Sequence, residues 1–146
     1  MAINSNSNAT ATTITTKNSN GMAERRYRPH TDRKLFEEYV RSDKYFADLS
    51  GKVVAITGTS PNSLGFHIAE VAVRKNVSHL LLLNRRIATN GSQELLQQIA
   101  KTFNSTTKIT SIECDLQDLA SVREAAKQVN VLCQKNNDNG LHVLIN

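Results

Sequence analysis

Residues 53–65 read Val-Val-Ala-Ile-Thr-Gly-Thr-Ser-Pro-Asn-Ser-Leu-Gly, and this stretch decides the fold. It begins with an apolar, β-branched run typical of a buried strand, followed by a loop that carries Gly58. Helical spacing of apolar residues then starts near Leu64. A strand, a glycine-bearing loop and a helix in this order place free backbone amides at a helix N-terminus. Such a site can bind the pyrophosphate of a dinucleotide.

The same alternation continues to the end of the chain. Short apolar runs predict strands over residues 52–57, 79–84, 108–115 and 141–146. Helical spacing predicts helices over residues 64–75, 92–103 and 118–135. Strand–helix alternation predicts an α/β fold with a doubly wound parallel sheet. Because crossovers are right-handed, we expect the strand order 3-2-1-4, with the first two helices on one face and the third on the other. The ligand crevice then lies between strands one and four, at their carboxyl ends.

The third of these helices should pack on the sheet through one apolar stripe. The residues of that stripe are Leu119, Val122, Ala126, Val129 and Cys133. This helix would cover its face of the sheet almost alone, and nothing follows the strand expected at residues 141–146. We therefore expect an incomplete sheet.

Three segments differ in composition. Residues 1–30 form a leader rich in Asn, Ser and Thr, which offers too little apolar surface to offset its ordering entropy, so we expect disorder there. Residues 31–47 have the spacing of an amphipathic helix, which Thr31 or Asp32 can cap. Residues 48–146 form the nucleotide-binding part.

Charge gives little direction about partners. The formal net charge is +5, and the basic run consists of Arg25, Arg26, Arg28, Arg33 and Lys34. Such a run either touches nucleic acid or anionic lipid or is a solvated leader. No aromatic stacking platform accompanies it, so we do not expect nucleic acid as a partner.

Cysteine content and hydropathy indicate the compartment. Cys114 and Cys133 fall in expected strand and helix interiors, as reduced thiols of an intracellular protein would. No apolar run approaches the ~20 residues of a membrane span. We expect a cytoplasmic protein, with the Ser/Thr-rich leader as an alternative organelle-targeting signal. The spacing of the histidines and cysteines fits no metal site.

Four motifs occur in order over residues 48–146: Thr57 to Gly65, Asn84-Arg85, Cys114-Asp115-Leu116, and Leu141 to Asn146. Together they resemble the short-chain dehydrogenase/reductase family, and within it the retinol dehydrogenases and protochlorophyllide reductases. Residues 57–65 resemble its Thr-Gly-x-x-x-Gly-x-Gly loop. Asn84-Arg85 follows the second strand, and Cys114-Asp115-Leu116 closes the third. Leu141 to Asn146 resemble the fourth strand, ending at the first Asn of Asn-Asn-Ala-Gly. The resemblance implies a Rossmann fold and a nicotinamide cofactor.

The resemblance also implies which residues contact the cofactor. They are Gly58, Thr59, Ser60, Asn62, Ser63, Leu64, Gly65, Asn84, Arg85, Arg86, Asp115, Leu116 and Asn146. No acid follows the second strand, where one would hold the ribose 2′-hydroxyl of NAD. Guanidinium groups there suit the 2′-phosphate, so we expect NADP rather than NAD. The alternative is a pair of solvated arginines, and Asp115 either contacts adenine or caps a helix.

The glycine loop departs from the family pattern. Gly58 and Gly65 lie seven positions apart instead of six, and the middle glycine is absent. Asn62 or Ser63 must take its place, and Asn tolerates a positive φ. The two glycines could instead serve only a tight strand-to-helix turn.

The family's catalytic Tyr with a Lys four residues later is absent. Tyr27, Tyr39 and Tyr45 are followed at that spacing by Thr, Asp and Leu. We therefore expect no catalytic residue here. The resemblance implies the cofactor half of an NADP-dependent oxidoreductase that moves a hydride between nicotinamide and a small carbonyl or alcohol, and it leaves an oligomer open. The alternatives are a non-catalytic NADP(H)-binding regulatory module and a truncated product without function.

Overall fold

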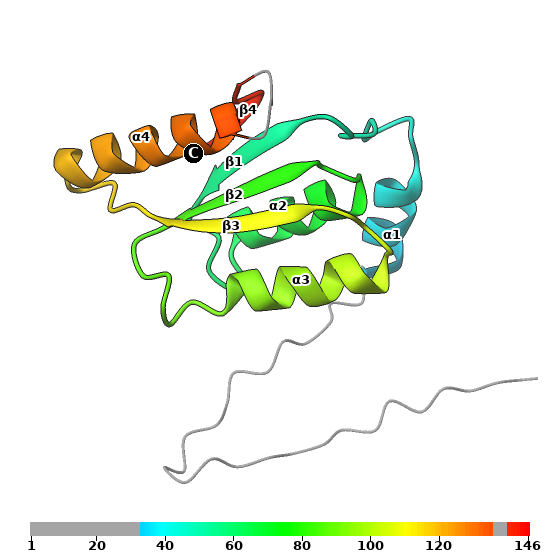
Figure 1. Cartoon of the computed structure of the whole chain (residues 1–146). Coiled ribbons are helices and arrows are strands. Elements are labelled where there is room, and N and C mark those ends of the chain that lie inside the picture. Colours follow the sequence, from blue (N-terminus) through cyan, green and yellow to red (C-terminus); the bar gives the residue numbers. More distant parts are fainter. Residues whose placement is uncertain (1–32, 136–139) are drawn as a thin grey trace, which may run out of the picture.

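The computed structural model describes residues 33–135 and 140–146, so the leader expected at residues 1–30 lies outside the described residues. The chain forms a parallel four-stranded sheet with helices on both faces (Figure 1). The strands are β1 (Val53–Thr57), β2 (His79–Asn84), β3 (Lys108–Glu113) and β4 (Val143–Ile145). The helices are α1 (Arg33–Arg41), α2 (Leu64–Arg74), α3 (Ser92–Thr102) and α4 (Leu119–Lys135).

The strand order is β3-β2-β1-β4, and all three pairings are parallel. The register pairs Thr57 with Leu83 and Asn84 with Glu113, so β1, β2 and β3 end side by side. This confirms the doubly wound α/β fold and the strand order 3-2-1-4. The outer strands are shorter than expected, because β3 ends at Glu113 and only three residues of β4 pair with β1.

The two faces of the sheet carry two separate cores, because successive strand residues point to opposite sides. Val54, Ile56, Leu80 and Leu82 pack with α2 and α3. The residues between them pack with α4. Figure 1 shows α4 on one side of the sheet and α2 and α3 on the other, as expected from right-handed crossovers.

The buried stripe of α4 differs from the expected one at two positions. Ala125 is buried and Ala126 is exposed, because Ala125, Val129 and Cys133 follow one another at intervals of four along the face toward the sheet. Leu119 is 67% exposed, since it is the first residue of the helix and lies at its free end. Val122 is partly buried against this core, as expected.

Helix α1 lies away from the carboxyl ends of the strands (Figure 1). It is shorter than the segment expected at residues 31–47, because a turn follows Ser42. The buried Arg74 at the end of α2 donates to Glu37 of α1 and lies over the ring of Phe36. In the part of the chain that is described, no helix is long and apolar enough to cross a membrane.

Candidate functional site

The loop after β1 turns sharply into α2. Gly58 has φ +63°, in the left-handed region that glycine adopts without strain. Asn62 has φ +66°, so the residue near the position of the missing glycine takes the conformation that we expected Asn to tolerate. The hydroxyl of Ser63 accepts from the Phe66 amide at 3.1 Å and donates to the Gly58 carbonyl at 2.7 Å. Ser63 therefore caps α2 and ties the helix start back to the end of β1.

Gly65 allows α2 to approach the end of β1. A Cβ at this position would lie 2.8 Å from the carbonyl oxygens of both Thr57 and Gly58. No side chain fits there without a shift of the backbone. The glycine is therefore required for the close contact between helix and strand.

The N-terminus of α2 provides donors for an anion. The first amides of a helix have no acceptor within it. Here the amides of Phe66 and His67 bond to Ser63, which leaves those of Leu64 and Gly65 without an acceptor in the helix. With the positive end of the helix dipole, these amides can bind phosphate.

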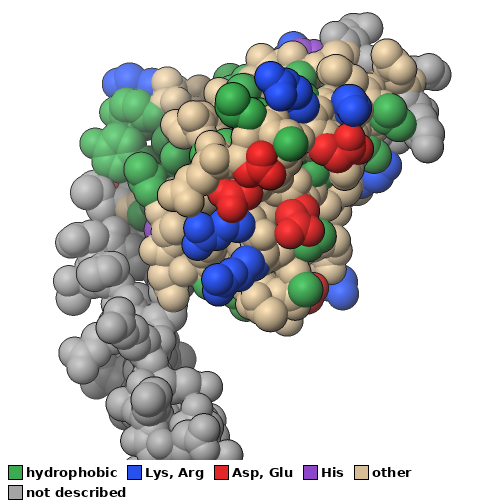
Figure 2. All heavy atoms as spheres, turned by 90° about the vertical axis from the view of Figure 1, so that its left-hand side faces the viewer, with side chains coloured by type: hydrophobic (Ala, Val, Ile, Leu, Met, Phe, Trp, Pro, Cys, Tyr) green, Lys and Arg blue, Asp and Glu red, His purple; other side chains and the backbone are tan. Residues whose placement is uncertain are grey.

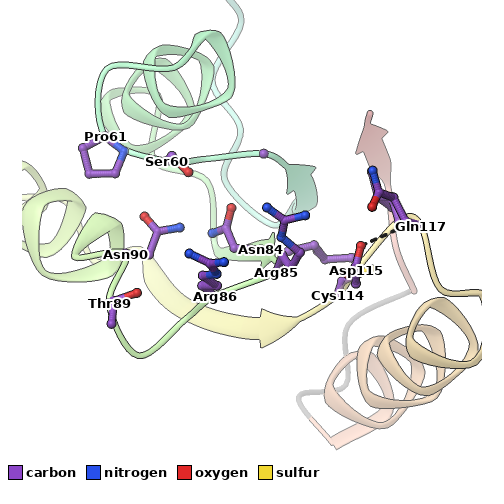
Figure 3. Close-up of a pocket in the computed structure, with 13 residues that line it drawn as sticks. Ser60, Pro61, Asn84, Arg85, Arg86, Thr89, Asn90, Cys114, Asp115 and Gln117 are labelled. Atoms are coloured by element: carbon purple, nitrogen blue, oxygen red, sulfur yellow. Dashed lines mark hydrogen bonds between the residues drawn. The ribbon is translucent and has the colours of Figure 1, made fainter.

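A cleft of about 590 Å³ lies where β1, β2 and β3 end (Figure 3). Seven of the predicted site residues line it: Gly58, Ser60, Asn84, Arg85, Arg86, Asp115 and Leu116. Of the other predicted residues, Thr59 is fully buried behind the loop. Asn62, Ser63, Leu64 and Gly65 form the turn and the start of α2 beside the cleft.

Arg85 and Arg86 line the cleft and are exposed. In Figure 3, Arg86 lies toward Thr89 and Asn90, and Arg85 lies toward Asp115. Figure 2 looks onto the end of the molecule where the strands finish and shows basic and acidic side chains interspersed over it. The positive charge of the arginines is therefore a local feature of the cleft and not part of a broad basic face.

Asp115 and Asp118 share the turn that leads into α4. The Asp115 carboxylate accepts from the Gln117 amide at 3.0 Å, and the Asp118 carboxylate accepts from the Ala120 amide at 2.9 Å. Asp118 also accepts from the Val122 amide through its backbone carbonyl, which makes it the cap of α4. Asp115 therefore shapes the turn before the helix while facing the cleft.

The side chain of Asn84 bonds to the loop after β1. Its Oδ1 accepts from the Thr59 amide at 2.8 Å, and its Nδ2 donates to the Thr59 hydroxyl at 2.7 Å. Both residues are buried. Asn84 was expected to contact the cofactor, but its carboxamide is engaged with Thr59.

Asn146 lies beyond β4, next to the end of β1. Its Oδ1 accepts from the Thr57 hydroxyl at 2.9 Å. It does not line the cleft that holds the arginines.

Sequence reasoning missed six residues that line the cleft: Pro61, Leu83, Thr89, Asn90, Cys114 and Gln117. Most of them lie within a few residues of predicted ones, in the loops that follow β1, β2 and β3. The rule that ligands bind at the carboxyl ends of parallel strands could have included these whole loops. Burial, and secondarily the neighbouring Asp115, raises the pKa of the Cys114 thiol, so this cysteine is not activated as a nucleophile.

Catalytic groups are not gathered in the described ranges. Tyr39 and Tyr45 belong to α1 and the turn after it, and neither lines the cleft. Over residues 33–135 and 140–146 no three His, Cys, Asp or Glu side chains come together as a metal site.

The sequence over residues 53–136, more than half of the chain, matches the family described as the KR domain. The chain belongs to the KR domain family. The KR domain contains every predicted site residue except Asn146. The match supports the short-chain dehydrogenase/reductase resemblance, but not the retinol dehydrogenase-like branch.

Two longer proteins are similar to parts of this chain. The chain is 28% identical over 101 residues to bli-4 of Neurospora crassa, described as a mitochondrial oxidoreductase, covering 68% of this chain and 23% of the relative. It also resembles the crystal structure of an NADPH-dependent 3-quinuclidinone reductase from Rhodotorula rubra, with a TM-score of 0.50 and 27% identity. That likeness covers 66% of this chain and 32% of the reductase. The chain thus spans about a quarter to a third of these relatives.

Proposed function

We propose that this KR domain chain is the NADP(H)-binding part of a short-chain oxidoreductase. The observation that carries the proposal is the pair Arg85 and Arg86, which follow β2 and line the cleft, with no acid before Glu94. Guanidinium groups can hold a 2′-phosphate through paired charged hydrogen bonds, whereas the 2′-hydroxyl of NAD calls for a carboxylate. The NADPH dependence of the Rhodotorula reductase adds support.

The other residues fit the rest of the cofactor. The amides of Leu64 and Gly65 suit the pyrophosphate, and Ser60 offers a hydroxyl on the same side of the cleft. Asp115 and Leu116 also line the cleft, and the Asp115 carboxylate can accept from the amine of adenine. Asn146 follows β4 and lies beside Thr57 at the end of β1. NADP(H), when bound, supplies the hydride chemistry.

We assign the hydride-transfer reaction to a longer protein that contains this chain. Its substrate class is a small carbonyl or alcohol, since that is what a nicotinamide hydride reduces or yields. No Tyr with a Lys four residues later is present in this sequence, so we propose that these 146 residues alone bind cofactor without turnover. The likeness to retinol dehydrogenases and protochlorophyllide reductases stays a prediction, as do cytoplasmic location and the absence of a nucleic-acid partner. The mitochondrial name of bli-4 supports the alternative of organelle targeting.

Titration of NADPH and NADH into the 146-residue chain tests the proposal. NADPH should bind more tightly. Arg85→Asp or Arg86→Asp should weaken NADPH by about tenfold to a hundredfold, because one charged hydrogen-bonded contact is worth roughly 1.5–3 kcal/mol. Lys101→Asp makes the same charge change in the last turn of α3, away from the cleft, and should leave the ratio of NADPH to NADH affinity unchanged. Equal affinities for the two cofactors in the unmutated chain would refute the NADP assignment.

The second candidate is a regulatory module that senses NADP(H) without turnover. The missing Tyr-x-x-x-Lys pair favours it over an enzyme for this sequence taken alone. Both candidates predict NADPH binding. They separate in an assay of NADPH oxidation with aldehydes and ketones by the full-length protein, where turnover identifies the enzyme.

A further inference from the structure

We infer that Asn84 is a positioning residue, which fixes the distance between the phosphate-binding turn and the arginine pair through its two hydrogen bonds to Thr59. The inference rests on the proposed NADP(H) site. It assigns Asn84 a role different from the direct contact with the cofactor that the sequence predicted.

The first step concerns how far the sheet guides the loop. Strands β1 and β2 pair up to Thr57 and Leu83, and the Gly58 amide donates to the Leu83 carbonyl at 3.1 Å. Beyond this point the loop must leave the sheet to turn into α2. The next amide, that of Thr59, donates to the side chain of Asn84 at 2.8 Å in place of a backbone carbonyl. The carboxamide thus extends the β1–β2 pairing by one residue.

The second step concerns the strength of this connection. The Asn84 side-chain Nδ2 also donates to the Thr59 hydroxyl at 2.7 Å, so both ends of the Asn84 carboxamide are bonded to Thr59. Thr59 is 0% and Asn84 5% exposed, and water cannot readily replace either bond. Breaking the pair leaves buried polar groups unpaired, which costs more than the bond itself contributes.

The third step concerns what the connection joins. The free turn starts at Ser60 and leads to the amides of Leu64 and Gly65. On the other side, Arg85 and Arg86 follow Asn84 directly, and the Asn84 carbonyl accepts from the Cys114 amide at 2.9 Å. The backbone that leads into the arginines is therefore bonded to the end of β3, whereas the start of the turn is bonded to β2 through the Asn84 side chain. Loss of that side chain should displace the turn and leave the arginines in place.

The experiment compares two ligands across a mutant cycle of Asn84→Leu, Thr59→Val and the double variant. NADPH reaches both the turn and the arginines, whereas adenosine 2′-monophosphate carries only the adenosine and 2′-phosphate. We expect Asn84→Leu to weaken NADPH by about tenfold or more and adenosine 2′-monophosphate by less than about twofold. The double variant should be no weaker than Asn84→Leu by more than about twofold, because Asn84→Leu already removes both bonds to Thr59, whereas Thr59→Val removes only the one to the hydroxyl.

Two controls separate positioning from general stability. Thr59→Ser keeps the hydroxyl and should bind NADPH within about twofold of the unmutated chain. Thr110→Val removes the contact between the Thr110 hydroxyl and His79 Nε2, 2.9 Å apart at the amino end of β2, and should lower Tm without changing NADPH affinity. Amide hydrogen exchange of the loop over residues 58–65 should speed up in Asn84→Leu but not in Thr110→Val.

The outcomes differ for the inference and for the proposed function. Because the Thr59 side chain is fully buried, weaker NADPH binding in Thr59→Val must act through the loop and would support the inference. Unchanged NADPH affinity in Asn84→Leu, or equal losses for both ligands in that variant, would overturn it. An unmutated chain that binds adenosine 2′-monophosphate and NADPH no better than NADH would instead overturn the proposed function, and the inference with it.

Discussion

Replacing Gly65 by Ala tests whether this position requires glycine because a side chain would clash with the end of β1. A methyl at this position would lie 2.8 Å from two carbonyl oxygens, those of Thr57 and Gly58. Neither oxygen belongs to a flexible side chain, so α2 must move away from the end of β1. Overpacking of this kind typically costs about 1–3 kcal/mol. At about 4 °C per kcal/mol for a domain of this size, Tm should fall by roughly 4–12 °C.

The same shift should weaken cofactor binding. The amides of Leu64 and Gly65 begin α2, so displacing the helix start moves the donors proposed for the pyrophosphate. We expect NADPH affinity to fall by about tenfold in a calorimetric titration. Scanning calorimetry of the same variant should show the loss in Tm.

The matched control is Gly51→Ala. Gly51 has φ +75°, and a methyl added there would meet nothing within 4 Å, so this change introduces backbone strain without a clash. It should cost about 1 kcal/mol and leave NADPH affinity unchanged. If Gly65→Ala melts at or above the temperature of Gly51→Ala, with NADPH affinity intact, the close-packing argument for Gly65 is wrong.

Three further outcomes follow from the described contacts. Ser63→Ala removes the cap of α2 and the bond to Gly58, and should lower the free energy of unfolding by about 0.5–2 kcal/mol in urea titrations, with Ser63→Thr close to the unmutated chain. The raised pKa of Cys114 means that the folded state keeps this proton to higher pH than the unfolded state, so stability should fall as pH rises past the ordinary thiol range, and less so in Cys114→Ala. The 146-residue polypeptide should bind a hydrophobic dye and self-associate in sedimentation, because apolar residues are exposed on the side of α4 and β4, namely Leu119, Leu141, Val143 and Leu144. Substituting these residues with Ser should reduce both dye binding and self-association. An unmutated chain that stays monomeric and binds no dye would contradict this expectation.

Much of the fold was predictable because it depends on periodicity. The run His79–Asn84 is apolar on both faces, which identified an inner strand with the boundaries that the structure has. Periodicity was weaker at the start of α4. Leu119 matched the apolar stripe in sequence, but a side chain in the first turn projects past the end of the sheet and has nothing to pack on. Local spacing cannot show where a helix stops facing its neighbour.

The site was predictable where it depends on local backbone. A positive φ at Asn62 follows from the need for a turn and from the tolerance of Asn for that region. The partner of Asn84 was not predictable, because Thr59 lies 25 residues away and an Asn that ends a strand can bond either to a bound cofactor or to a neighbouring loop. The register of β1 against β2 places the loop after β1 beside Asn84, and local sequence does not specify that register.

The cleft therefore depends on the sheet in a definite order. Backbone bonds from Gly58 to Leu83 and from Cys114 to Asn84 hold the three strand ends together before any cleft side chain contributes. Side chains that project from these ends, such as Arg85 and Arg86, are exposed, and in the proposed NADP(H) site they set which dinucleotide binds without changing the fold. Thr59 and Asn84 differ from them because they are buried and join two strand ends. Cofactor preference and loop placement should thus respond to different residues, although those residues are adjacent in sequence.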